Sequence, residues 1–310
     1  MNLKIRTYNQ VAEAESNLPD QVAEAARRVA VRLHTVQMTL AVMSGKGGVG
    51  KSMVSALLAA SFARRGMKTG LLDADLNGPS TAHLLGVDGD GLAVGPEGIE
   101  PARSSGDVRI MSMSLILDQD AALSWREPRD SGYIWRGAQE RRALREFLAD
   151  TAWGRLDIMV IDLPPGGPRL ADLHAMVPDL TGVVVVTAPG RSARDAVARS
   201  LDLARARSAP VAGLIENMSG VVCSECGEIT RVHEGGEADA LAARFGVPVL
   251  GALPLDSGLA AAADGGRVED WTDRKGAAGS VRDLVRQLAL RTEEELQRLR
   301  LEHPRGGSGG

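Results

Sequence analysis

The residues most able to do chemistry form a glycine-rich run with two lysines, Gly45–Ser52, which reads GKGGVGKS. It satisfies the pattern G-x-x-x-x-G-K-[ST] in the required setting, because an apolar segment, Thr39–Met43, precedes it and a helical pattern follows. Glycines let the backbone wrap a phosphate closely, and the N-terminus of the next helix adds positive potential. The run predicts a nucleotide site made of Gly45, Lys46, Gly47, Gly48, Val49, Gly50, Lys51 and Ser52.

Two side chains of this run have separate expected roles. Lys51 is expected to act catalytically against the β- and γ-phosphates, and the Ser52 hydroxyl is placed to bind Mg²⁺. The alternative is a glycine-rich turn that binds nothing, and the correct order of strand, loop and helix patterns disfavours it. These residues predict a Mg²⁺-dependent ATPase.

Aspartates end two other apolar segments. Asp73 and Asp75 close the segment LLDAD, and Asp162 closes MVID. The carboxyl ends of parallel strands line the ligand crevice of an open α/β sheet, where a carboxylate can hold Mg²⁺ or orient water. We therefore predict that Asp162 is a catalytic Mg²⁺ ligand and that Asp75 is a catalytic residue that positions water or metal. For Asp73, an assisting role and a structural hydrogen bond are equally expected.

The elements that must position these groups follow from an alternating pattern that starts at Met38. Short apolar runs such as Val183–Val186 lack polar alternation, which is typical of strands buried on both faces of a parallel sheet. Helical patterns separate them, so we predict a doubly wound, mostly parallel α/β sheet with helices on both faces, the P-loop NTPase architecture. Residues 86–132 are expected to form an insertion of short strands and loops. The expected helices are Ser52–Arg65, Gln139–Ala149, Ser192–Arg207, Glu237–Phe245 and Val281–Leu299.

Composition divides the chain into four parts. Residues 1–37 are expected to form a leader and one helix, 38–272 the ATPase domain, 273–299 a C-terminal helix, and 300–310 a disordered Gly- and Ser-rich tail. The whole sequence has 310 residues, of which 44% are hydrophobic and 25% charged, so it can bury a substantial core.

Charge and hydropathy disfavour several classes of partner. The formal net charge is −4, which gives no overall attraction to nucleic acid or anionic membranes. Met1–Gln10 lacks the apolar stretch of a signal peptide, and no apolar run approaches the ~20 residues that span a bilayer. We expect a cytoplasmic protein with no nucleic-acid partner and no stable membrane association. Its two cysteines, Cys223 and Cys226, are too close together to form a disulfide framework.

Lys46 is the first residue that indicates a narrower group. The run KGGVGKS resembles the deviant Walker A loop of the MinD, ParA and nitrogenase iron protein class. In that class the extra lysine reaches across a dimer interface to the partner's nucleotide, so the resemblance implies that Lys46 is a catalytic charge stabiliser acting in trans. The alternative is a solvated lysine on a loop.

Further motifs resemble one family within that class, the Mrp/ApbC family of P-loop ATPases, which carry or assemble iron–sulfur clusters. They follow the family's order over about three quarters of the chain, and MinD-like relatives lack the cysteine motif. The motifs are GKGGVGKS, DADLNGPS (Asp73–Ser80), WRG (Trp135–Gly137), WGxLD (Trp153–Asp157), IDLPPG (Ile161–Gly166), ENMSG (Glu216–Gly220), CxxCG and LGxxPLD (Leu250–Asp256).

The resemblance implies roles for residues far along the chain. Asn217 resembles the adenine-reading asparagine of the family, and Pro254 and Asp256 lie where the adenosine moiety is usually contacted. Cys223 and Cys226 match the pair that donates two thiolates from each subunit to a cluster bridging a homodimer. A four-iron cluster needs four cysteines and this chain has two, so dimerisation supplies the others. The implied partners are a second copy of the chain and recipient iron–sulfur apoproteins.

One segment departs from the family pattern. Where the family continues P-P-G-T-[GS]-D, this chain has PPGGPR, Pro164–Arg169. The threonine hydroxyl and the aspartate are missing, and Asp172 is the one candidate substitute. The rate of hydrolysis, and its coupling to dimer closure, are therefore open. Ala138 stands where a proline is common.

Three interpretations of the cysteine pair compete. The resemblance favours a bridging iron–sulfur cluster, whereas a zinc ion shared by two subunits would use the same four thiolates. A thioredoxin-like redox pair is weakest, because that motif opens a helix and this one lies in a Gly- and Glu-containing loop. His233 lies nearby and is expected to be a surface residue rather than an extra ligand.

We therefore predict a homodimeric ATPase that binds ATP and Mg²⁺ and carries an iron–sulfur cluster of the 4Fe-4S type. The alternative is a MinD- or ParA-like positioning ATPase with a structural zinc at the cysteine pair. That class needs a membrane-binding helix or a basic surface, but Val281–Leu299 mixes Arg and Glu and is typical of a packing helix. A third interpretation is a carrier with vestigial hydrolysis, which the altered segment after Pro165 also fits.

Overall fold

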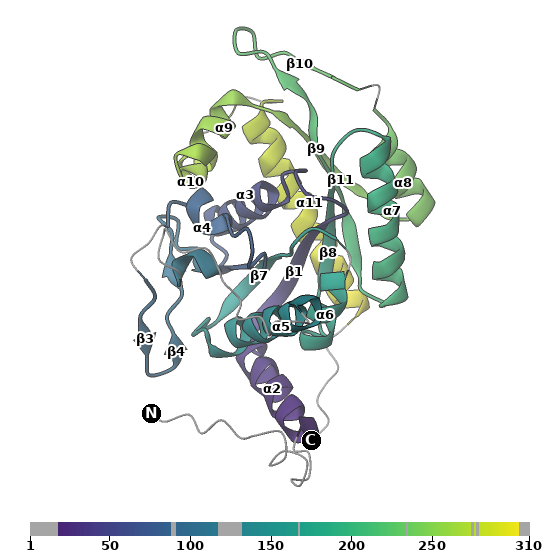
Figure 1. Ribbon diagram of the computed structural model, residues 1–310. Helices are drawn as coiled ribbons and strands as arrows, with labels where there is room; N and C mark the ends of the chain where they lie inside the picture. The colour runs from purple at the N-terminus through teal and green to yellow at the C-terminus, as the bar shows by residue number, and fades with distance from the viewer. Residues whose placement is uncertain are drawn as a thin grey trace.

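The computed structural model describes residues 18–87, 91–116, 132–166, 168–233, 235–273, 276 and 279–303. Within them, nine strands form one sheet in the order β10-β9-β8-β1-β7-β2-β6-β5, and β11 pairs with β9 (Figure 1). All pairs of this sheet are parallel except β9 with β10 and β5 with β6. The predicted mostly parallel α/β sheet is confirmed. The strands are β1 (Val36–Ser44), β2 (Thr69–Asp73), β5 (Ala102–Arg103), β6 (Arg109–Met111), β7 (Leu156–Asp162), β8 (Gly182–Thr187), β9 (Val211–Val222), β10 (Ile229–Thr230) and β11 (Val249–Leu255).

The central strands are apolar throughout because each of their faces is covered. On β1, Leu40 and Val42 belong to one hydrophobic cluster, while Ala41 and Met43 belong to the other. All six residues of β8 are buried, which explains why its sequence shows no polar alternation. The sheet therefore forms the middle layer of a three-layer arrangement.

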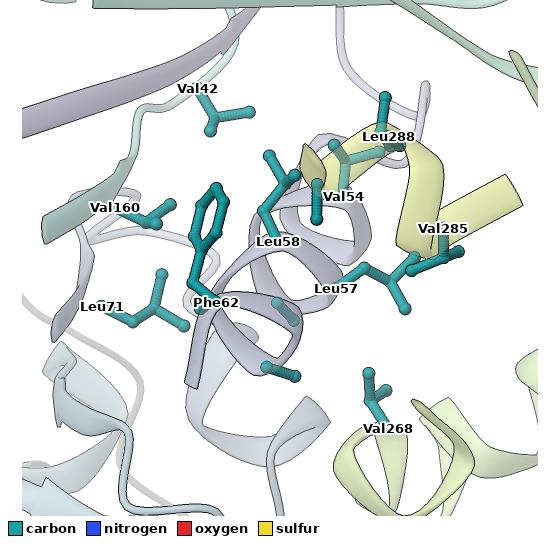
Figure 2. Close-up of a cluster of buried hydrophobic side chains, with 14 of the residues drawn as sticks. Val42, Val54, Leu57, Leu58, Phe62, Leu71, Val160, Val268, Val285 and Leu288 are labelled. Carbon is teal, nitrogen blue, oxygen red and sulfur yellow. The ribbon is translucent and has the colours of Figure 1, made fainter. Parts of the chain in front are cut away.

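Helix α3 (Lys51–Arg64), which begins in the phosphate loop, is the centre of the first helical layer. Figure 2 shows Leu58 and Phe62 of α3 facing Val42 on the sheet, while Leu57 faces Val285 on the opposite side. The helix is enclosed between the sheet and other helices, so its hydrophobic residues are not confined to one stripe. The covering helices are α9 (Ser257–Asp264), α10 (Val268–Asp273) and α11 (Val281–Glu302), with α4 (Thr81–Leu84) beside them.

The second layer covers the opposite face of the sheet. Helices α2 and α5 pack against one another, and α7 packs against α8 (Figure 1). Trp153 is fully buried beneath this layer and is among the largest side chains of the core. The helices of this layer are α2 (Leu18–Leu33), α5 (Gly132–Asp150), α6 (Pro168–Met176), α7 (Arg191–Ala206) and α8 (Glu237–Phe245).

The structure moves several predicted boundaries. The first strand begins at Val36 rather than near Met38, and α5 begins at Gly132, seven residues before the predicted Gln139. The C-terminal helix runs from Val281 to Glu302, so residues 300–302 continue the helix rather than a disordered tail. Of the predicted tail, 304–310 lie outside the described residues, as does the leader 1–17. Helices α2 and α11 each bury side chains in one of the two hydrophobic clusters. This packing explains why α11 is longer than its sequence pattern predicts.

The insertion predicted over residues 86–132 contains short elements in its described parts. A hairpin of β3 (Val94–Gly95) and β4 (Gly98–Ile99) is followed by β5, β6 and the 3₁₀ turn η1 (Met113–Leu115). Residues 88–90 and 117–131 lie outside the described part of the chain. Across the described residues, no helix combines the length and the apolar character needed to cross a bilayer.

Candidate functional site

The predicted phosphate loop and the predicted aspartates meet at the carboxyl edge of the sheet. β7 lies between β1 and β2, and its last residue, Asp162, pairs with Val42 on one side and Asp73 on the other. The loop that follows β1 leads directly into α3 at Lys51. Parallel pairing thus brings together groups that are about 110 residues apart, as ligand sites of open α/β sheets require.

Asp162 is the centre of the site. Its Oδ2 atom accepts hydrogen bonds from Lys51 Nζ and Ser52 Oγ, both at 2.6 Å, and its Oδ1 atom accepts one from Ser55 Oγ at 2.6 Å. Asp162 is 0% exposed and Lys51 is 6% exposed, so this ion pair is shielded from water. The hydroxyl of Ser52 and the carboxylate of Asp162 are hard oxygen donors in contact, which is a donor set that fits Mg²⁺.

Ser55 is a member of the site that the sequence analysis missed. It lies four residues after Lys51, on the same face of α3, and its Oγ atom is also 3.1 Å from the Lys51 carbonyl oxygen, the longer of its two contacts. The i, i+4 spacing is the signal that would have found it, because residues at that spacing are neighbours on a helix surface.

Asp73 has a structural role in this geometry. Its carboxylate accepts hydrogen bonds from the backbone N–H groups of Asp75, Ser80 and Thr81 and from the Thr81 hydroxyl, at 2.9 to 3.1 Å. Burial and the nearby charge of Asp162 raise the pKa of Asp73 to about 6, although these hydrogen bonds oppose the shift. Of the two roles expected for Asp73, the structural hydrogen bond is the one observed.

Asp75 lies nearer the surface than Asp73. Burial raises the pKa of its carboxyl, while the positive charge of Lys51 lowers it and Asp162 raises it further. The Asp75 N–H donates to Asp73 Oδ1, and Asp73 is paired with Asp162, so Asp75 lies beside the strand ends that carry the site. Its predicted roles toward water or metal remain predictions.

The phosphate loop is braced by two elements distant in sequence. A Cβ atom added at Gly45 would lie 2.4 Å from the carbonyl carbon of Ala196, so α7 approaches the loop too closely for any side chain. Gly50 adopts a φ of +77°, in the left-handed region, and a Cβ there would lie 2.1 Å from Asn217 Nδ2. A side chain at Gly45 would therefore require α7 to move, and one at Gly50 would require Asn217 to move.

Lys46 projects from the loop toward α7. Its Nζ atom donates a hydrogen bond to Ser192 Oγ, at 3.1 Å, in the first turn of that helix. The Lys46 side chain is only partly buried, so its Nζ atom can exchange the Ser192 hydroxyl for a different acceptor, such as an anion. The role in trans stays a prediction.

Asn217 connects the phosphate loop to β9. Its Nδ2 atom donates to the Val49 carbonyl oxygen at 2.9 Å, and the next residue, Met218, has a φ of +60°. A non-glycine residue in the left-handed region is uncommon, and such strain is often found at functional positions. The observed contact of Asn217 braces the loop, and its predicted role in reading adenine stays a prediction.

The predicted adenosine segment lies on the neighbouring strand. β11 pairs with β9 so that Leu253 is opposite Asn217, which places Pro254 next to that position. Asp256 caps α9, because its Oδ1 atom accepts a hydrogen bond from the Leu259 backbone N–H at 2.6 Å. The segment therefore lies near the loop, and Asp256 also has a structural role that the sequence analysis did not identify.

The two cysteines lie in the turn between β9 and β10, which projects beyond the rest of the sheet (Figure 1). Both are exposed and free. The Cys223 backbone N–H donates to the Glu228 carbonyl oxygen, and the Gly227 N–H donates to the Cys223 carbonyl oxygen. The backbone N–H of Cys226, followed by that of Glu225, lowers the pKa of the Cys223 thiol. A thiol held near backbone N–H groups is favoured as a thiolate ligand.

The cysteine turn is not a complete metal site in one chain. Among the described residues, no group of three or more His, Cys, Asp or Glu side chains could hold a metal ion. His233 is exposed and supplies no third ligand there. The motif lies in a hairpin turn and does not open a helix, which disfavours the thioredoxin-like interpretation.

Exposed apolar side chains surround the cysteine hairpin. Val221 on β9 pairs with Thr230 of β10 and with Leu255 of β11, and Val221 and Leu255 are 42% and 48% exposed. Ile229 and Val232 on the same hairpin are 39% and 63% exposed. Side chains alternate between the two faces of a strand pair, so Val221, opposite Thr230, and Ile229, opposite Val222, lie on different faces of the hairpin. Each face of the hairpin therefore exposes apolar area near the cysteines.

Comparison with known proteins decides the family. A family model described as ParA, "NUBPL iron-transfer P-loop NTPase", matches residues 35–289, most of the chain. The chain belongs to this family. The resemblance to the Mrp/ApbC family is confirmed, because relatives of this NUBPL-type NTPase are named iron–sulfur cluster carriers.

Three relatives illustrate the family. The iron-sulfur cluster carrier protein of Saccharolobus solfataricus is 36% identical over 79% of this chain and 80% of its own length. That of Methanocaldococcus jannaschii is 33% identical over 88% and 91%, respectively. The cytosolic Fe-S cluster assembly factor NUBP2 of Bos taurus is 37% identical over 77% of this chain and 87% of its own length.

Solved structures agree with the family assignment. A nucleotide-binding protein from Archaeoglobus fulgidus, in complex with ADP, is 35% identical, has a TM-score of 0.68, and covers 79% of this chain and 93% of its own. The cell division ATPase MinD of Pyrococcus furiosus is 18% identical with a TM-score of 0.56, over 83% of this chain and 99% of its own. The likeness to MinD shows a shared fold, so the positioning-ATPase alternative has less support than the carrier family.

Proposed function

We propose that this NUBPL-type NTPase is a homodimeric ATPase that carries an iron–sulfur cluster bridged between two subunits by Cys223 and Cys226. The observation that carries the proposal is the course of β9. Asn217 on this strand contacts the phosphate loop, and the same strand ends at the cysteine turn. A nucleotide-dependent shift of the loop therefore has a direct structural connection to the cluster ligands.

The nucleotide half of the proposal rests on groups that are already assembled. Lys51 Nζ is buried and donates to Asp162, so a bound phosphate would compete for a donor that is held in place. Ser52 and Asp162 would hold Mg²⁺, which would neutralise developing charge on the phosphates of bound ATP. Preorganised charge in a shielded site acts without the reorganisation that water would require.

The hydrolytic step is assigned to residues around Lys51 and Asp162. Asp75 would orient the attacking water, and Lys46 would leave Ser192 to contact the partner's nucleotide when the subunits close. The contact between Lys46 and Ser192 is a single hydrogen bond of a partly exposed side chain, so exchanging it costs little. Asn217, Pro254 and Asp256 are proposed to contact the adenosine moiety.

The cluster half of the proposal follows from a deficit. Two thiolates per chain leave a four-iron cluster half-coordinated, and a second copy of the chain supplies two more. Exposed apolar side chains on the same hairpin, among them Val221 and Val232, give that second copy apolar area to bury beside the cysteines. Backbone N–H groups of the turn lower the pKa of the Cys223 thiol, which shifts its equilibrium toward the thiolate that binds a metal.

The cluster is the cargo of this protein rather than a resident cofactor. Relatives are named carriers or assembly factors, so the proposed partners are recipient iron–sulfur apoproteins, and the names of the NUBP2 and CFD1 relatives include the word cytosolic. We propose a cytoplasmic location for this chain. Exposed thiols on a projecting hairpin allow a recipient's cysteines to reach the cluster.

The test is anaerobic reconstitution with iron and sulfide, followed by the visible spectrum and the metal content per dimer. The wild type is compared with a Cys223→Ala/Cys226→Ala variant. A cysteine-dependent charge-transfer absorption, with about four irons per dimer, is expected. If iron does not bind and zinc is retained instead, the pair is a structural metal site and the carrier proposal is wrong.

A further inference from the structure

A buried carboxylate lies between the two segments that follow β2 and β7. Glu140, on α5, is 6% exposed. Its Oε1 atom accepts a hydrogen bond from Asn77 Nδ2 at 2.9 Å, and its Oε2 atom forms an ion pair with Arg169. One side chain of the covering helix therefore contacts both segments at once.

The first of these segments is the turn Asp75–Gly78. The Gly78 N–H donates to the Asp75 carbonyl oxygen, and the Asp75 N–H donates to Asp73 Oδ1. The turn is thus attached at two points: its Asp75 N–H to Asp73, and its Asn77 side chain to Glu140. Because Asp75 begins this turn, the position of its carboxylate depends on both attachments.

The second segment runs from Asp162 to the start of α6. Arg169 lies in the first turn of α6, and its guanidinium also contacts Asp172 Oδ2 at 3.4 Å. Asp172 in turn lies 4.0 Å from Arg141. Asp172, the candidate substitute for the family's missing aspartate, is therefore paired with two arginines on the side of α5 and α6.

The two segments enclose a cavity of about 20 Å³, lined by Leu76 and Asn77 from one side, Pro164 and Arg169 from the other, and Glu140 from α5. That volume admits about one water molecule. The contact between the segments is therefore close and polar.

We propose that Arg169 and Glu140 form a positioning pair. Glu140 holds Asn77 by a hydrogen bond, and Asn77 belongs to the turn that carries Asp75, so the pair fixes the position of Asp75 relative to Asp162. This inference rests on the proposed ATPase function and deepens it. β2 and β7 are paired so that Asp73 lies opposite Asp162. Beyond the ends of these strands, the positioning pair joins the segment that follows β2 to the segment that follows β7. Arg169 thereby takes up a coupling role in the segment where the threonine and aspartate of the family pattern are missing.

The physical reason is the cost of an unpaired charge. Glu140 is buried, and Arg169 is its cationic partner among the side chains that the structure describes, so loss of Arg169 would remove that pairing from a shielded carboxylate. The side chain would then move toward water or take up a proton, and the Asn77 hydrogen bond would weaken. The turn that carries Asp75 would become mobile, while the phosphate loop and its contacts would stay intact.

The test compares steady-state ATP turnover of Arg169→Ala and Glu140→Gln with the wild type. We expect kcat to fall about tenfold or more with KM changed less than about twofold, because misplacing a positioned group affects the transition state more than ground-state binding. Glu140→Gln keeps the side-chain shape, so it remains informative if Arg169→Ala unfolds. Arg142→Ala is the matched control, since Arg142 is exposed on α5 and pairs with Glu146 of the same helix.

The charge-swapped variant Glu140→Arg/Arg169→Glu separates positioning from mere structural damage. The Asn77 amide can turn over and present its oxygen to the new arginine, so at least partial recovery of kcat is expected. Amide hydrogen exchange at Gly78 in the nucleotide-free protein should rise in Arg169→Ala and fall again in the swap.

The outcomes distinguish failure of the proposed ATPase function from failure of the positioning pair alone. Wild-type turnover equal to that of a Lys51→Ala variant would mean that the hydrolytic function itself is wrong. Wild-type turnover well above that level, with Arg169→Ala and Glu140→Gln unchanged or with the swap no better than the single variants, would overturn the positioning pair alone.

Discussion

Around the phosphate loop, Asp162 receives three hydrogen bonds from its own chain, and Lys51 is paired and buried. On the cysteine hairpin, two exposed thiols have no third ligand beside them in the described part of the chain. The groups of the first region already contact one another within one chain, whereas the second, in the function proposed here, is completed by another chain. Preorganised charge suits chemistry on a phosphate, and an open half-site suits cargo that must be released.

The comparison predicts that the cysteine hairpin can fail without affecting the phosphate site. Cys223→Ser/Cys226→Ser should abolish iron binding after reconstitution, because no other cysteine exists in the chain. ATP turnover of the metal-free variant should stay within about twofold of metal-free wild type, since neither thiol contacts the loop. Iron content and turnover are measured on the same preparation, and retained iron would place the cluster elsewhere.

The next largest effect is expected at Lys51. Lys51→Ala should lower kcat by about a hundredfold or more. The substitution removes a buried cation that is placed to stabilise the negative charge on the transferred phosphoryl group. The exposed Lys68→Ala is the control and should match the wild type. Iron loading of Lys51→Ala should persist, and a parallel loss of iron would show that the two regions are less separate than the structure indicates.

Gly45 tests how tightly the phosphate loop is held by α7. Gly45→Ala should lower the free energy of unfolding by about 1–3 kcal/mol, because the added methyl group meets the Ala196 backbone. Gly78→Ala is the control, since open space surrounds its Cβ position. Urea unfolding of both variants gives the comparison, and equal stabilities would mean that α7 moves away at little cost.

The smallest expected effect concerns the pH dependence at Asp73, whose pKa is raised from 3.8 to about 6. The folded chain then binds more protons than the unfolded chain between these values. This contribution to the free energy of unfolding is therefore full below about pH 4 and is lost as the pH rises through 6. Relative to Asp73→Asn, wild-type stability should fall by about 1 kcal/mol per pH unit across that range. Urea unfolding at successive pH values measures it, and a flat difference would show that the hydrogen bonds cancel the burial.

Much of the fold was predictable because its signals are local. The helix Glu237–Phe245 and the buried strand around Val183–Val186 follow from spacing and composition within a few residues. The boundaries that moved, such as the start of α5 at Gly132 and the end of α11 at Glu302, depend on packing. Helix ends are decided by neighbours that periodicity does not reveal.

The candidate site divides in the same way. The phosphate loop, the strand-end aspartates and the cysteine pair were each recognisable from residue type and position. Ser55 was missed although its spacing from Lys51 carried a signal, and Glu140 was missed because its two partners lie 63 and 29 residues away in sequence.

The sequence by itself determined which groups are present: a phosphate-loop motif with an added lysine, carboxylates at strand ends, and one pair of cysteines. The tertiary structure decided which of them touch. It set Asn217 of β9 against the loop, Ala196 of α7 against Gly45, and Glu140 between two segments that follow different strands. Such contacts depend on parallel pairing and helix packing across long stretches of chain, and local pattern carries no information about them.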